Sequence, residues 1–100
     1  MADSAAFELA CETLALDTSL DRLTARGTVR LALKAAGLEA RHVAPDQMAV
    51  VVANLLPKEL AARGVEDGDR VCAAVGAKLT RLRTDEAAET PEAVFARLGG

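Results

Sequence analysis

Residues 45–57, with the sequence PDQMAVVVANLLP, decide the fold of this chain. Pro45 suits the first position of a helix, because its missing N–H would have no partner there. Asp46 follows in the first turn, where the helix dipole favours negative charge. The valines at 50–52 favour β-structure, so a buried strand would fit the same letters. No other segment shows strand alternation, and a lone strand would leave its backbone groups unpaired. We therefore predict a central, largely buried helix over Met48–Leu56.

The segments after this helix also contain residues that commonly begin or end helices. Pro57 cannot lie inside the preceding helix without a kink, so we expect it to open a short helix, Pro57–Arg63, which ends at Gly64. Asp67 can cap the next helix, and Gly76 is a possible point of close approach to a neighbouring helix. The buried residues expected of that helix are Val71, Cys72, Val75 and Leu79.

The C-terminal region divides into a polar and an amphipathic part. Residues 84–89 are polar and acidic, and we interpret them as an exposed linker. Thr90 and Pro91 have the sequence of a helix cap and first position. A short last helix is expected to carry Val94, Phe95 and Leu98 before two glycines end it, and to dock within its own chain, exchange onto a neighbour or fray.

The segments before Pro45 form two further predicted helices. The first begins after Asp3 or Ser4, either of which can cap it. Its apolar residues recur at helical spacing, at Phe7, Ala10, Cys11 and Leu14.

The second of these helices is expected over residues 19–36, after a polar cluster at Asp17, Thr18 and Ser19. Its buried face is predicted to include Leu20, Leu23 and Thr24 and to continue through Val29, Ala32, Leu33 and Ala36. Gly27 either breaks this helix or is tolerated within it at a cost of ~1 kcal/mol, and we favour one continuous helix. Gly37 is well placed to end it.

The composition supports an all-α fold. The chain has 100 residues, of which 51% are hydrophobic, and its only aromatic residues are Phe7 and Phe95. Alanine, leucine, glutamate and arginine, all common here, lose little conformational freedom in a helix. We predict a single helical domain over residues 1–100, built as a small irregular bundle of four to six short helices.

Charge and cysteine content point to a cytoplasmic protein. The net charge of −3 offers little attraction to nucleic acid or to an anionic membrane. No apolar run has membrane-spanning length, and residues 1–16 lack the pattern of a secretory leader, so we expect no membrane association. Cys11 and Cys72 stand far apart among apolar neighbours, which favours buried thiols over a disulfide; a redox pair would require their helices to meet.

A row of cations is the sequence's one candidate binding feature. Arg22, Arg26, Arg30 and Lys34 follow one another at intervals of four residues, so a continuous helix would place them along one slowly drifting face. Such a face could bind an acidic partner or a phosphate backbone. It could equally be a solvated face opposite the Leu23, Val29 and Leu33 stripe, with acidic residues nearby to balance its charge.

No catalytic, metal-binding or cofactor-binding residues are predicted. His42 is the only histidine, it has no cysteine near it in sequence, and we assign it to the surface. No serine or cysteine stands beside a histidine, and no glycine-rich phosphate loop occurs. The carboxylates at Glu66, Asp67 and Asp69 suit capping and solubility better than paired acid and base chemistry.

These features favour a small non-catalytic protein-interaction or regulatory module, which binds another protein or forms a homodimer. The alternative is a nucleic-acid-binding regulator that uses the basic row. A helix-turn-helix is disfavoured, because the loop between Gly37 and Pro45 is longer than the usual three or four residues. We expect no enzyme activity and no cofactor.

Overall fold

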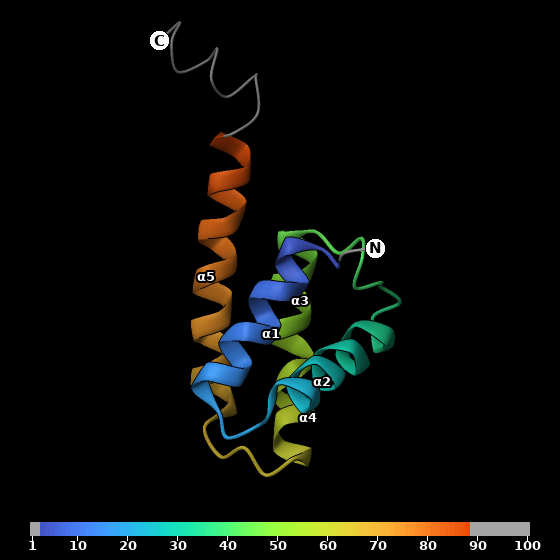
Figure 1. Ribbon diagram of the computed structural model, residues 1–100, viewed down its shortest axis with the longest axis vertical. Coiled ribbons are helices and arrows are strands. Elements are labelled where there is room, and N and C mark those ends of the chain that lie inside the picture. The colour runs from blue at the N-terminus through green and yellow to red at the C-terminus, as the bar shows by residue number, and fades with distance from the viewer. Residues whose placement is uncertain (1–2, 89–100) are drawn as a thin grey trace, which may run out of the picture.

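The computed structural model describes residues 3–88, and within them it contains five α-helices and no strand. Side chains are described for residues 3–84. The helices are α1 (Ala5–Asp17), α2 (Arg22–Ala35), α3 (Pro45–Asn54), α4 (Leu56–Ala62) and α5 (Gly68–Ala88), arranged as Figure 1 shows. The predicted all-α class and helix number are confirmed. The predicted helix over residues 90–98 lies outside the described residues.

Helix α3 lies at the centre of the bundle and packs against each of the other four helices. It begins at Pro45 as predicted, and the backbone N–H of Ala44 donates to Oε1 of Gln47 at 2.9 Å. The valine run is helical, but only two of the three valines are buried, and Val50 is 60% exposed. Because successive helical residues turn by about 100°, three neighbours cannot all face one core. The prediction of a largely buried segment was therefore too broad.

Helix α1 begins where the sequence predicts. The Oγ of Ser4 accepts a hydrogen bond from the backbone N–H of Phe7 at 3.1 Å, which caps the helix. All four predicted apolar residues of α1 are buried, and Phe7 is fully so.

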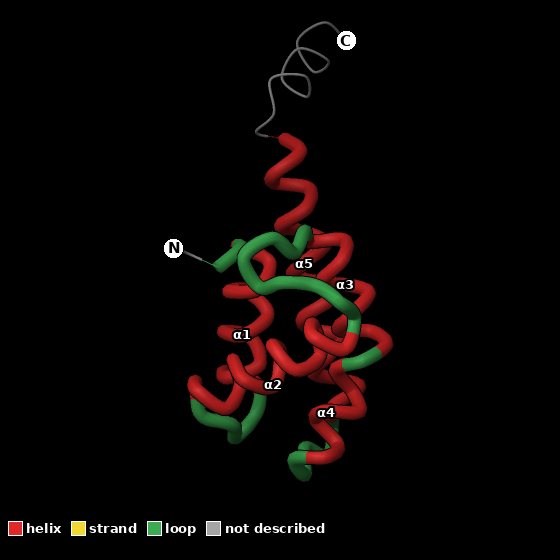
Figure 2. The backbone as a smooth tube through the Cα atoms, turned by 90° about the vertical axis from the view of Figure 1, so that its right-hand side faces the viewer, coloured by secondary structure: helices red, strands yellow, loops and turns green. Residues whose placement is uncertain are grey.

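Helix α2 is continuous through Gly27, as predicted, but it begins three residues later than expected. Thr18 holds the connection outside the helix, because its Oγ1 donates to the carbonyl of Leu14 and accepts from the N–H of Leu20. The helix ends before Gly37, which has a φ of +75°, a left-handed conformation that glycine adopts without strain. The connection to α3, residues 36–44, crosses one end of the bundle (Figure 2).

Helices α4 and α5 lie where the sequence predicts them, with two corrections. Pro57 is the second residue of α4, and the turn after it contains Gly64, with φ of +79°. The expected close approach at Gly76 was wrong, because nothing lies within 4 Å of where a Cβ would stand. The close approach falls instead at Gly68, where an added Cβ would lie 3.4 Å from the Cβ of Leu60.

Helix α5 extends further than the sequence analysis expects. Residues 84–88, interpreted there as part of an exposed linker, continue the helix to Ala88. Their polar composition does not prevent helix formation, since they contain neither glycine nor proline and end in two alanines. The C-terminal turns of α5 project beyond the other helices in Figure 1 and Figure 2.

The core is built mainly of aliphatic side chains, together with Phe7, and is continuous across all five helices. Its two buried threonines are compatible with an apolar interior; Thr28, for example, donates from Oγ1 to the carbonyl of Thr24 at 2.7 Å. Cys11 and Cys72 are buried free thiols, as expected. Helices α2 and α5 do not contact each other, because α1, α3 and α4 lie between them.

Candidate interaction surface on α2

Helix α2 has one face in the core and one face in solvent. The inner face consists of Ala25, Thr28, Val29, Ala32 and Leu33, all buried. Leu23, which the sequence analysis places on this inner face, is instead 78% exposed, and Thr24 is also exposed. Leu23 precedes Val29 by six residues, so it lies about 120° around the helix from that buried side chain. Helical periodicity alone assigns it to the outer face.

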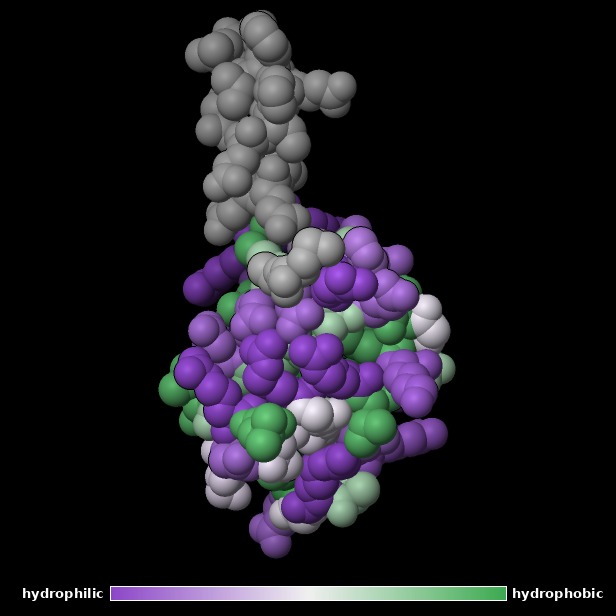
Figure 3. All heavy atoms as spheres, turned by 45° about the vertical axis from the view of Figure 1, so that its right-hand side comes forward, coloured by the Kyte–Doolittle hydropathy of each residue, from purple (hydrophilic) through white to green (hydrophobic). Residues whose placement is uncertain are grey.

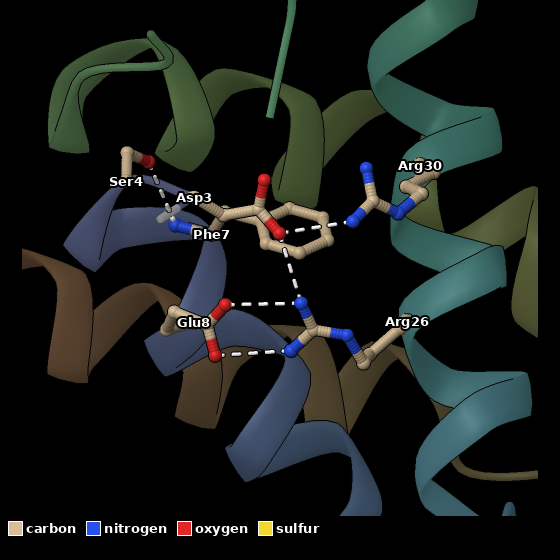
Figure 4. A network of polar contacts seen from close by, with 6 residues as sticks. All are labelled: Asp3, Ser4, Phe7, Glu8, Arg26 and Arg30. Atoms are coloured by element: carbon tan, nitrogen blue, oxygen red, sulfur yellow. Dashed lines mark hydrogen bonds and ion pairs between the residues drawn. The ribbon is translucent and has the colours of Figure 1, made fainter. Parts of the chain in front are cut away.

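The basic row does not form a uniform surface, because two of its members bind carboxylates of the N-terminal region (Figure 4). Both terminal nitrogens of Arg26 donate hydrogen bonds to the carboxylate of Glu8, each at 3.0 Å, and one of them also donates to Asp3 at 2.8 Å. Arg30 donates to the same Oδ2 of Asp3 at 2.9 Å. Asp3 and Glu8 therefore join α2 to the start of α1.

The same two guanidinium groups also cover the ring of Phe7. The Cζ atom of Arg26 lies 5.2 Å from the ring centroid and that of Arg30 lies 4.8 Å from it. These distances are within the range of cation–π attraction. Figure 4 shows Phe7 between the two arginines, with Asp3 between their nitrogens. The side chains of this network thus cover a buried aromatic ring.

The ionisation of this network follows from its geometry. The hydrogen bonds from Arg26 lower the pKa of Glu8 from its ordinary value of 4.5, and the bond to Glu8 raises the pKa of Arg26. Both groups are therefore charged at neutral pH. A phosphate or an acidic partner would have to displace two carboxylates from Arg26, whereas Arg30 donates one bond to Asp3 and its side chain is 51% exposed.

The ends of the row are different. Among the described residues, no carboxylate lies within ion-pair distance of Arg22 or Lys34. Arg22 borders a shallow hollow with Glu12, Ala15 and Leu16. Lys34 stands exposed in the last turn of α2.

An apolar stripe lies on the solvent face of α2. We define the α2 outer face as Leu23, Gly27 and Leu31, which recur at intervals of four residues and therefore share one side of the helix. Leu23 is 78% exposed and Leu31 is 48% exposed. No atom lies within 4 Å of the point where a Cβ of Gly27 would stand, so the surface is open between the two leucines. Lys34 follows Leu31 by three residues and lies beside the stripe.

Other exposed apolar side chains lie elsewhere. Leu16 near the end of α1 is 78% exposed, and Val50 of α3 is 60% exposed. On the face drawn in Figure 3, hydrophobic patches are separated by hydrophilic side chains rather than joined into one area. Single exposed leucines are ordinary on protein surfaces, whereas a pair on one helix face forms a possible contact stripe.

The remaining chemistry-bearing residues do not gather into a site. His42 is exposed, as expected, with its Nε2 3.7 Å from Glu39. Burial raises the pKa of the Cys11 thiol to about 12 and that of Cys72 to about 11, which keeps both protonated. Within the part of the chain that the structure describes, no group of three or more histidine, cysteine or carboxylate side chains could hold a metal ion. No helix in that part is both long and apolar enough to span a membrane.

No protein-family model, no curated protein and no solved structure significantly matches this chain.

Proposed function

We propose that this domain is a small non-catalytic interaction module that binds a protein, a second copy of itself included, through the α2 outer face. The observation that carries the proposal is the pair of leucines, 78% and 48% exposed, on the solvent side of a helix that already has a complete buried face. A helix needs only one apolar stripe to join its own core. The second stripe has no role in the described fold.

The charges around the stripe agree with this reading. Arg26 pairs with Glu8 of α1, and both Arg26 and Arg30 pair with Asp3 just before it, so these bonds join α2 to the start of α1. Lys34 remains available beside Leu31 to select a partner of negative charge. A rigid helix presenting an apolar stripe with a cation at its edge suits an amphipathic helix of acidic character.

Nucleic-acid binding by Arg22, Arg26, Arg30 and Lys34 is the alternative. It would use mainly Arg22, Lys34 and the half-exposed Arg30, because Arg26 is bound to both Asp3 and Glu8. Phosphate binding by the row would weaken steeply with added salt. An unchanged mobility of DNA and RNA in low salt would exclude it.

The experiment compares three forms of the chain: the natural sequence, the double variant L23E/L31E and the single variant V50E. Val50 is a matched control, because it is as exposed as the stripe residues but lies on α3. Solution mass is measured together with retention of proteins on the immobilised chain. The proposal predicts an association, with itself or with another protein, that L23E/L31E removes and V50E retains.

Two results would contradict the proposal. One is a natural chain that stays monomeric at every concentration and retains no protein. The other is an association that V50E removes as completely as L23E/L31E does. Far-ultraviolet circular dichroism accompanies each measurement to establish that the variants keep their helices.

A further inference from the structure

The α2 outer face has the same order of side chains in both directions along the helix. Leu23 stands four residues before Gly27, and Leu31 stands four residues after it. Each leucine therefore lies about 40° around the helix from Gly27, one on either side. Turned by 180° about Gly27, the stripe again presents a leucine, a glycine and a leucine. Such a surface can meet a second copy of itself under the two-fold symmetry of a homodimer.

We infer that the α2 outer face binds the same face of a second copy of the chain, with the two helices antiparallel and crossing at Gly27. The inference rests on the proposed function and names its partner. Leu23 of each copy then lies opposite Leu31 of the other, and two equivalent contacts close the dimer. Helix α2 lies at the edge of the bundle, on the side away from α5 (Figure 1), so a second copy can approach its outer face.

Gly27 allows the two helices to come close where they cross. It is exposed, and no atom lies within 4 Å of the point where its Cβ would stand. Helix axes usually pack about 8–10 Å apart, and the side chains at the contact set that distance. With glycine on both helices at the crossing, we expect the lower end of this range. The leucines on either side of the crossing then come into contact.

The charges of α2 favour the antiparallel direction. Arg30 and Lys34 lie in the C-terminal half of the helix, whereas Asp21 stands exposed at its N-cap. A parallel pair would place Lys34 beside Lys34 of the second copy, and like charges facing each other across an interface are unfavourable. In an antiparallel pair, Lys34 reaches the level of the second copy's Asp21, because the two residues lie about 10 Å and 9 Å along the axis from Gly27.

Both members of this expected ion pair are available to form it. Within residues 3–84, whose side chains the structure describes, neither Asp21 nor Lys34 has an ion-pair partner. Asp21 lies at the edge of the contact, and the flexible four-carbon stem of lysine lets the ammonium group reach it. Arg26 and Arg30 add little repulsion between the copies, because carboxylates of their own chain already bind them.

The size of the contact limits its affinity. Helix α2 has 14 residues, so the contact is at most about 21 Å long and about one helix diameter, 10 Å, wide. Stable dimers usually bury about 800 Å² of accessible surface on each partner, which is more than one short helix provides. We therefore expect a weak, reversible dimer with a Kd between about 10 µM and 1 mM.

The test is sedimentation equilibrium of the full chain and of variants in α2. The natural chain, of 10.4 kDa, should approach twice that mass as its concentration rises toward about 1 mM. The double variant L23E/L31E should weaken association at least about tenfold, whereas V50E on α3 should leave it unchanged. Far-ultraviolet circular dichroism establishes that each variant keeps its helices.

Two further sets of variants test the antiparallel arrangement. K34E places a second carboxylate opposite Asp21, so it should weaken association at least about threefold, and the charge exchange D21K/K34E should restore most of the loss. G27A adds a methyl group to each helix at the crossing, so it should weaken association as well. Its matched control is G76A on α5, which should leave association unchanged.

Three outcomes would overturn the inference. A natural chain that stays monomeric up to about 1 mM but retains another protein through Leu23 and Leu31 excludes the second copy and leaves the proposed function standing. A dimer that L23E/L31E leaves unchanged forms through a different surface, and it contradicts the proposed function as well. A dimer that K34E strengthens pairs its helices in parallel, which contradicts the antiparallel arrangement.

Discussion

Replacing Gly27 by alanine should stabilise the domain, and this follows from the continuity of α2. Gly27 is the sixth of fourteen helical residues, it is exposed, and no atom stands within 4 Å of the new Cβ. Alanine in a helix interior is favoured over glycine by about 0.5–1 kcal/mol, because the unfolded glycine has more freedom to lose. Nothing in the surroundings opposes that gain.

The expected change is large enough to measure by thermal or urea unfolding. For a domain of this size, 1 kcal/mol corresponds to roughly 4–8 °C in the unfolding midpoint, so G27A should raise it by about 2–8 °C. Unfolding should be measured at low protein concentration, where association does not contribute to stability.

Two glycines serve as controls. Gly76 is also helical and open, so G76A should stabilise to a similar extent. Gly37 has φ of +75°, so G37A should destabilise by about 1 kcal/mol. A G27A variant that is less stable than the natural chain, while G76A is more stable, would refute a continuous α2.

Three further predictions concern the network at Phe7 and the thiols. Substitution R26A should lower the free energy of unfolding by about 1–2 kcal/mol in urea, through lost hydrogen bonds and ring contact, whereas R22A should cost under about 0.5 kcal/mol; equal costs would exclude a structural role for the network. Because the pKa of Glu8 is lowered, its contribution to the free energy of unfolding is complete above its ordinary pKa of 4.5 and is lost as the pH falls through the lower value of the folded state. The stability of E8Q should therefore fall less steeply with acid than that of the natural chain. Parallel plots of stability against pH would count against this. Cys11 and Cys72, with pKa values raised to about 12 and 11, should react with a thiol reagent at mildly alkaline pH only after denaturation; prompt labelling of the folded chain would contradict their burial.

Most of the fold could be predicted from the sequence, because local signals mark most of the helix ends. Pro45, Ser4 and Gly37 each act through their own backbone geometry, and the structure places all three at the expected boundaries. The valine run was resolved by exclusion, since a strand would have had no partner. The continuation of α5 to Ala88 could not be predicted in this way, because an acidic composition does not specify backbone conformation.

The candidate surface was predicted less well than the fold. The basic row could be predicted from its four-residue spacing. Its pairing with Asp3 and Glu8 depends on how α1 and α2 cross, and the spacing of residues along one helix gives no information about that crossing. The sequence prediction placed Leu23 on the buried face that continues through Val29 and Leu33. Its angular position relative to Val29 carried the correct signal.

Methyl NMR of the natural chain across a concentration series tests the central claim most directly. If the α2 outer face is where copies of the chain meet, the methyl resonances of Leu23 and Leu31 should shift or broaden between about 10 µM and 1 mM. Those of the buried Leu33 and of the exposed Val50 should stay where they are. Shifts at Val50 with none at Leu23 and Leu31 would contradict the claim.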